Sequence, residues 1–210
     1  MSLLQERPAP AHPPRIEGKE VLIGPDPAVC KVKGVMFGGR KQFLLATIGE
    51  EGFNKLLAKL TPRTRSYVKT PLASSWCEFE SLIELDRAIH EELKTTHPNV
   101  LALIGAASAE LGIGRVYKSL DSDVLENFLA SNALFHNQYQ QFGTVKFEKT
   151  PTGGRMIYSN YPCYSPIYCA SAVGFFLESI LRHGGENPTV TETKCQCHGD
   201  KTCTFEMTWK

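Results

Sequence analysis

The C-terminal segment, residues 189–210, gathers metal-ligand side chains around a Gly-Asp turn. Glu192, Cys195 and Cys203 flank this turn, and Cys169 lies further upstream. Zinc takes four thiolate, imidazole or carboxylate ligands in a tetrahedron, and a hairpin together with one distant element can supply them. The sequence therefore predicts a zinc site that ties a terminal hairpin to a preceding helix, which restricts how the chain can fold.

Three further side chains are alternative ligands, namely Cys163, Cys197 and His198. On a strand Cys195 and Cys197 point to the same face, so spacing does not decide between them. A single cysteine is more often an ordinary buried residue, but several thiols beside a carboxylate favour a metal. Four protein ligands leave no open position for water, so the predicted zinc is structural.

Composition limits the kinds of partner. With 210 residues and 42% hydrophobic content, the chain can bury the core of one domain. The net charge is +1 without a long run of like charges, which disfavours nucleic acid. The sequence has neither a signal-peptide pattern nor an apolar run long enough to span a membrane, so we expect a cytoplasmic protein without a membrane partner. Seven cysteines clustered towards one end favour metal binding in a reducing compartment over a disulfide framework.

The first half is expected to be mainly helical. Residues 1–18 are rich in proline and predict a disordered arm, and residues 19–210 form the single domain. A weak strand is expected over 29–37. Helical spacing follows over 43–48 and 53–60. Later helices are expected from a capping box at Ser75 and Glu78, over 99–111, and after a cap at Asp121 or Ser122.

The second half predicts two hairpins around one buried helix. Residues 144–147 and 155–158 alternate about a Pro-Thr-Gly-Gly turn. Ser165 and Pro166 begin an apolar helix that extends to Leu181. Segments 189–195 and 202–209 form the terminal hairpin. The predicted fold class is therefore α+β, with helices packed on an antiparallel sheet.

These C-terminal residues resemble a known family. The segments are Glu192-Thr193-Lys194-Cys195, then Gly199-Asp200, then Cys203-Thr204-Phe205. They resemble the 4-vinyl reductase domain, a small-molecule-binding module distantly similar to TRAPP subunits. The spacing is also similar to phenol-sensing domains of enhancer-dependent activators, which carry zinc on three cysteines and a glutamate. The resemblance covers residues 144–209 and places these ligands at Cys169, Glu192, Cys195 and Cys203.

The resemblance implies a stand-alone sensory or adaptor domain. Such a domain would bind a small hydrophobic or aromatic ligand, would signal through a separate effector protein, and is expected to form a homodimer. Aromatic side chains around the start of the buried helix suit an apolar pocket. The candidate ligand-binding residues are Phe147, Tyr158, Tyr161, Tyr168, Trp76 and His136.

Two alternative functions remain. The chain could be a ligand-free scaffold, or an accessory protein of tetrapyrrole metabolism. No catalytic arrangement is recognised, because the adjacent Cys197 and His198 would face apart on a strand, so an enzyme is not expected. Haem is not favoured, because the sequence lacks Cys-x-x-Cys-His and Tyr-x-Ser-x-Arg motifs.

Overall fold

The computed structural model describes residues 15–22, 30–112 and 124–210. It confirms the predicted α+β class. The helices are α1 Val35–Ala58, α2 Pro62–Lys69, α3 Phe79–Leu93, α4 Val100–Leu111, α5 Leu125–Leu134 and α6 Pro166–Arg182, with the short 3-10 helices η2 His136–Gln138 and η3 Gln196–His198. The strands are β1 Lys31–Lys33, β2 Trp76–Glu78, β3 Thr144–Thr150, β4 Gly153–Ser159, β5 Thr189–Lys194 and β6 Cys203–Thr208.

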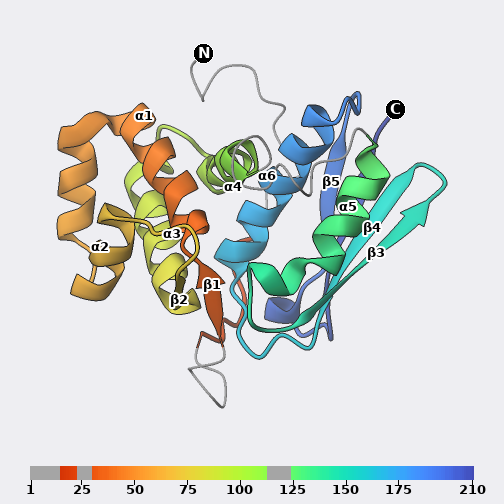
Figure 1. The fold of residues 1–210 in the computed structure, drawn as a ribbon, viewed down its shortest axis with the longest axis horizontal. Coiled ribbons are helices and arrows are strands. Elements are labelled where there is room, and N and C mark those ends of the chain that lie inside the picture. The colour runs from red at the N-terminus through yellow and green to blue at the C-terminus, as the bar shows by residue number, and fades with distance from the viewer. Residues whose placement is uncertain (1–14, 23–29, 113–123) are drawn as a thin grey trace.

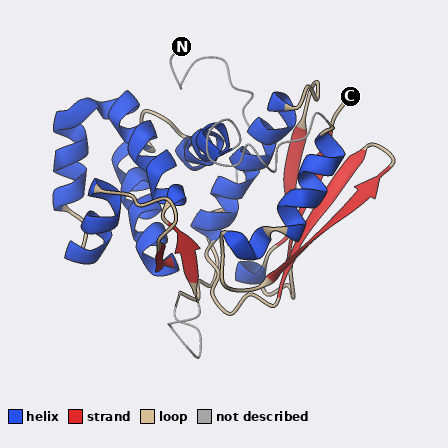
Figure 2. Ribbon diagram, in the orientation of Figure 1, coloured by secondary structure: helices blue, strands red, loops and turns tan. Residues whose placement is uncertain are grey.

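The molecule has two halves that meet along α6. Helices α1 to α4 gather on one side with the small β1–β2 sheet, and we call this the helical half (Figure 1). The sheet half holds an antiparallel sheet of order β3-β4-β6-β5, together with α5 and α6 (Figure 2). Each half has its own buried apolar cluster. Helix α6 contacts both the sheet and α4, so its residues can reach the cores of both halves.

The contact between α4 and α6 depends on two glycines. A Cβ at Gly105 of α4 would lie 1.8 Å from the Ser171 carbonyl oxygen. A Cβ at Gly174 of α6 would lie 1.8 Å from the Ala102 carbonyl oxygen. The two helix backbones therefore touch directly, and only residues without a Cβ allow this approach.

The β1–α1 region differs from the expected strand over 29–37. The strand ends at Lys33, and α1 begins at Val35. Val35 and Phe37 are buried from helical positions, because an imperfect alternation also fits one face of a helix. The two predicted helical runs that follow belong to α1, which is interrupted at Gly49, where φ is 65°. A positive φ breaks the helical path, and glycine adopts it without a steric penalty.

The start of α3 also differs from the prediction. The helix begins at Phe79, and residues 76–78 form β2, so Ser75 does not cap it. Pairing of β2 with β1 takes up the residues that a capping box would use, and this pairing is a tertiary effect that local sequence does not reveal. The predicted helix over 99–111 is confirmed as α4.

The second half follows the prediction closely. Both hairpins and the buried helix that starts at Pro166 are present. The terminal hairpin has η3 and the left-handed Gly199 between its strands. The cap at Asp121 or Ser122 and residues 1–14 of the predicted arm lie outside the described residues. The domain boundaries of 1–18 and 19–210 stay a prediction.

Within the described ranges, no helix is both long and apolar enough to cross a membrane.

Candidate functional site

A cavity of about 110 Å³ lies where the two halves meet, and we call it the interface cavity. Its walls come from α1, α4, α5, η2, β4 and α6. Aromatic rings of Phe128, Tyr158 and Phe175 provide apolar surface, and Arg40 and Ser108 provide polar groups. A space with apolar walls and a few fixed polar groups is typical of small-molecule sites.

A buried ion pair forms the polar wall of the interface cavity. Arg40 of α1 donates from Nε and Nη2 to the two carboxylate oxygens of Asp86, at 2.8 Å each. Its Nη1 donates to Ser108 Oγ at 2.7 Å, and weaker contacts of 3.4 Å reach Ser171 Oγ and the Met36 carbonyl oxygen. The exposed fractions of the Arg40 and Asp86 side chains are 3% and 0%. A buried pair with this bidentate geometry cancels the charge on both partners.

A second polar network borders the cavity at η2. His136 Nε2 lies 2.9 Å from the Phe142 carbonyl oxygen, and this contact places the ring proton on Nε2. Burial lowers the pKa of His136, so its imidazole is neutral near pH 7. The Tyr161 hydroxyl donates to Gln140 Oε1 at 2.7 Å, and Gln140 Nε2 donates to the Tyr168 hydroxyl. The bonds of Gln140 join the segment that follows η2 to the loop before α6 and to α6 itself.

Tyr158 on β4 lies in the cavity wall among several other aromatic rings. Its ring contacts those of Tyr161, Phe176 and Phe205, with centroids 5.5, 6.4 and 5.7 Å away. Its hydroxyl forms no hydrogen bond with another residue in the described part of the chain. Burial raises the pKa of Tyr158 well above its usual value, so the hydroxyl keeps its proton.

The predicted metal ligands do come together. One ligand atom from each of Cys169, Glu192, Cys195 and Cys203 lies within 4.8 Å of the others, and we call these residues the thiol–carboxylate group. The Cys169 sulfur lies 3.7 Å from that of Cys203 and 3.9 Å from that of Cys195. Helix α6 supplies Cys169 and the terminal hairpin supplies the other three ligands. This donor set could hold a metal ion.

Glu192 has an unusual environment for a carboxylate. Its Oε1 atom is buried and forms no hydrogen bond within the described structure. Burial raises the pKa of Glu192 to about 8. Hydrogen bonds from neighbouring thiols, first among them Cys169, lower the pKa of Cys195. A buried carboxylate oxygen without a partner is costly, and coordination to a metal ion would satisfy it.

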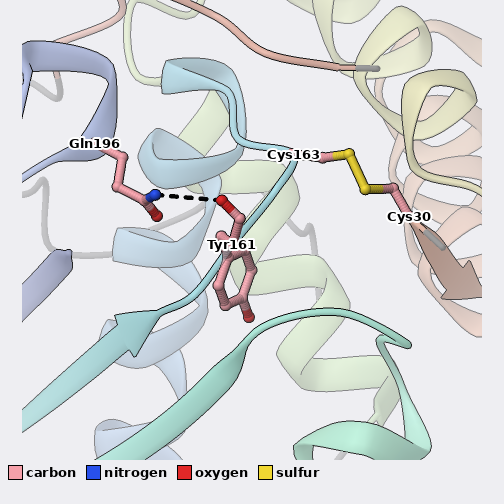
Figure 3. The surroundings of a disulfide bond; sticks show 4 residues. All are labelled: Cys30, Tyr161, Cys163 and Gln196. Atoms are coloured by element: carbon pink, nitrogen blue, oxygen red, sulfur yellow. Dashed lines mark hydrogen bonds between the residues drawn. A yellow bond between two sulfur atoms is a disulfide. The ribbon is translucent and has the colours of Figure 1, made fainter. Parts of the chain in front are cut away.

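The alternative ligands are placed differently. Cys163 forms a disulfide with Cys30, so it is not available as a ligand, and the expectation of reduced cysteines throughout is wrong for this pair (Figure 3). His198 is exposed, and its Nε2 lies 2.6 Å from the Glu17 carbonyl oxygen. Cys197 is buried next to the thiol–carboxylate group but is not one of its four members.

Residues near the disulfide connect the interface cavity with the thiol–carboxylate group. Figure 3 shows Gln196 reaching the backbone of Tyr161, two positions before Cys163. The backbone N–H of Gln196 also donates to Cys203 Sγ at 3.3 Å. A second cavity of about 20 Å³ is lined by Tyr158, Tyr168 and Cys203, among others, and so lies between the interface cavity and the thiol–carboxylate group. The two sites are therefore neighbours.

The predicted ligand-binding residues divide into two sets. Tyr158, Tyr168 and His136 line the interface cavity. Tyr161 lines only the second cavity. Phe147 packs over Gly154 at the sheet edge, and Lys33 Nζ lies 3.9 Å from the Trp76 ring centre, so both lie outside the cavity wall.

The sequence did not reveal the polar wall. Charged residues are normally exposed, so the sequence does not predict that Arg40 and Asp86 are buried. One indication was present: Arg40 lies between the apolar residues Phe37 and Phe43, and Asp86 lies between Leu82 and Ile89. A charge inside an apolar helical stripe is typical of a buried pair.

This arrangement of helices and sheet is the fold of H-NOX domains. An H-NOX protein from Shewanella oneidensis in the Fe(II)NO ligation state has a TM-score of 0.67 and 16% identity, covering 85% of this chain and 99% of that one. An oxygen-binding H-NOX domain related to soluble guanylate cyclases, solved as an oxygen complex, has a TM-score of 0.63 and 14% identity, covering 85% and 95%. An Fe(II) unliganded H-NOX protein from K. algicida has a TM-score of 0.63 and 13% identity, covering 85% and 96%.

Neither a family model nor a curated protein matches the chain. The resemblance to the 4-vinyl reductase domain is therefore corrected, because the chain shares its fold with solved H-NOX domains. The short C-terminal pattern supported that resemblance, whereas the fold comparison covers 85% of the chain. Zinc as the cofactor is corrected for the same reason, since the structural neighbours are described with iron(II).

Iron in these neighbours raises the question of whether the interface cavity suits haem. Haem iron needs an axial ligand such as histidine, and His136 is the histidine in the described cavity wall. The space does not fit, because about 110 Å³ is less than the roughly 150 Å³ of a cavity that holds benzene. A porphyrin contains four pyrrole rings and is therefore much larger than benzene. Arg40, the cation in the described wall, is already paired with Asp86.

Proposed function

We propose that this protein is a sensory domain that binds a small molecule in the interface cavity and passes the signal to a partner protein. The supporting observation is the cavity itself, which lies between the two halves and has both apolar and polar walls. A ligand there contacts α1 and α4 on one side and β4 and α6 on the other. Its occupancy would therefore bias the relative position of the two halves.

The fold supports a binding role. An H-NOX structural neighbour is described as an oxygen-binding domain related to soluble guanylate cyclases, and others as iron complexes of nitric oxide or carbon monoxide. Our proposal keeps small-molecule sensing and does not include haem, because the cavity is too small for it. The ligand is expected to be of benzene size or smaller, and the flexible Met36 in the wall can adapt to its shape.

The first test is a thermal-shift screen with small apolar and weakly polar compounds. A ligand present at about 100 times its Kd adds roughly 2.7 kcal/mol to the free energy of unfolding. The variant Ala172→Leu places a larger side chain in the cavity wall and should weaken binding about tenfold or more. Ala130→Leu makes the same change on the exposed face of α5, away from the cavity, and should leave binding unchanged.

Two outcomes would contradict this proposal. One is a screen in which no compound stabilises the protein. The other is a ligand whose affinity is equal in Ala172→Leu and the wild type. Hemin is included as a separate compound, and we expect no haem absorption band in the purified complex. A band with one haem per chain that is lost in His136→Ala would show that our size argument is wrong.

We also propose that the thiol–carboxylate group holds one thiophilic metal ion in a structural role. The support is the convergence of four ligand atoms and the unpartnered oxygen of Glu192. Such an ion would join α6 to the terminal hairpin, and its binding free energy would add to the stability of the fold.

Elemental analysis of protein purified without added metal tests this site. We expect about one metal ion per chain, lost in Cys203→Ser together with a clear drop in melting temperature. Cys77→Ser is the control, because Cys77 is a buried free thiol of β2 outside the group. Metal-free wild-type protein, or a full metal content in Cys203→Ser, would rule out the proposed ligand set.

A further inference from the structure

The charge of the interface cavity restricts the ligand that it accepts. Of the described residues that line the cavity, Arg40 is the one with a permanently charged side chain, and Asp86 neutralises it. A charged ligand would lose its hydration and would find no unpaired counter-charge, so its binding would be strongly disfavoured. An uncharged ligand avoids this cost.

The donors of Arg40 are also fully used. A guanidinium group has five N–H donors, and those of Arg40 reach Asp86, Ser108, Ser171 and the Met36 carbonyl. The serine hydroxyls donate in turn to backbone carbonyls, Ser108 to Ile104 at 2.9 Å and Ser171 to Tyr168 at 3.1 Å. A ligand would have to displace existing bonds to use this wall.

Tyr158 offers an unused hydrogen-bond donor, which the Arg40 wall lacks. Its hydroxyl has no hydrogen-bond partner among the described residues, and its ring is fixed by Tyr161, Phe176 and Phe205. Strand pairing places Tyr158 opposite Cys203 in the sheet, which further limits its movement. A rigid ring with an unused O–H is a suitable anchor for an acceptor atom.

We propose that the interface cavity selects a small uncharged molecule with one hydrogen-bond acceptor, such as a carbonyl or ether oxygen, and that the Tyr158 hydroxyl anchors this acceptor. This inference rests on the proposed ligand-binding function. It adds the chemical class of the ligand and names the residue that recognises it.

Three probes of similar size test the ligand class: cyclopentane, cyclopentanone and cyclopropanecarboxylate, titrated at pH 7.5 with NMR detection. We expect the ketone to bind at least about tenfold more tightly than the carboxylate. Tyr158→Phe should weaken ketone binding about five- to tenfold, the effect of one lost hydrogen bond, and should leave cyclopentane within about twofold. Tyr164→Phe is the control, because Tyr164 does not line the interface cavity.

The outcomes separate this proposal from the sensory function. If the carboxylate binds more tightly than the ketone, or if Tyr158→Phe leaves ketone binding unchanged, the ligand class is wrong. The cavity would still be the binding site if Ala172→Leu weakens every probe that binds. If none of the probes binds although the thermal-shift screen yields another ligand, the ligand class alone fails. If both experiments find no ligand, the sensory function fails as well.

Discussion

At the scale of single residues, the buried polar side chains lie where the two halves meet. Arg40, Asp86, Ser108 and Ser171 come from four different helices and satisfy one another away from water. Buried polar groups are costly unless they are paired, so this network specifies how α1, α3, α4 and α6 must be arranged. Apolar side chains alone would specify the arrangement less strictly.

His136 gives a prediction about pH. Its pKa is lowered by burial, so below pH 6.5 the unfolded chain binds a proton more readily than the folded protein. Stability from the neutral imidazole is therefore present above about pH 6.5 and is lost as the pH falls. We expect the free energy of unfolding, measured in urea at pH 7.5 and 5.0, to fall less in His136→Gln than in the wild type.

The matched control is His97→Gln, a change in the loop after α3. This variant should show the wild-type dependence on pH. An identical decrease in His136→Gln and the wild type would mean that His136 does not contribute. Other groups also titrate in this range, His90 among them, so only the difference between variant and wild type is informative.

At the scale of elements, the α4–α6 crossing holds the two halves together. Gly105→Ala would place a methyl group 1.8 Å from a carbonyl oxygen of α6, and neither backbone can move without disturbing the cavity wall. We expect a loss of at least about 3 kcal/mol in the free energy of unfolding, because overpacking against backbone cannot relax locally.

Gly38→Ala is the control within α1. A Cβ there would lie 3.4 Å from Leu111 Cδ2, an ordinary contact, so the change should be neutral or stabilising by up to about 1 kcal/mol. Equal stability of the Gly105→Ala and Gly38→Ala proteins in urea unfolding would show that the helices can separate without cost.

At the scale of the whole molecule, one covalent bond joins distant parts of the chain. The Cys30–Cys163 disulfide links positions 133 residues apart and connects the approach to β1 with the loop before α6 (Figure 3). A cross-link over such a long loop restricts the unfolded chain. The double variant Cys30→Ala/Cys163→Ala should lose about 2–5 kcal/mol in the free energy of unfolding.

Mass spectrometry of unreduced protein, after blocking free thiols in denaturant with a metal chelator so that the buried thiols are accessible, checks the bond directly. We expect two of the seven cysteines to resist blocking before reduction, since two form the disulfide. If every cysteine is blocked, or if the double variant is as stable as the wild type under oxidising conditions, the bond does not contribute to the fold.

Local patterns in the sequence determined the second half of the chain. Alternation and turn residues predicted both hairpins, and Ser165-Pro166 predicted the start of α6. The thiol–carboxylate group could also be predicted, because three of its members lie on one hairpin. These features depend on residues close together in sequence, where periodicity and turn chemistry decide the structure.

Only the tertiary structure decided the rest. The partner of Cys163 lies 133 residues away, and Arg40 and Asp86 are separated by 46 positions, so no local pattern connects either pair. The interface cavity arises from the way the two halves pack, through the glycines of α4 and α6. The C-terminal motif pointed to one family, whereas the arrangement of the whole chain is that of another. Non-local packing decides such features, because each contact depends on elements that form elsewhere in the chain.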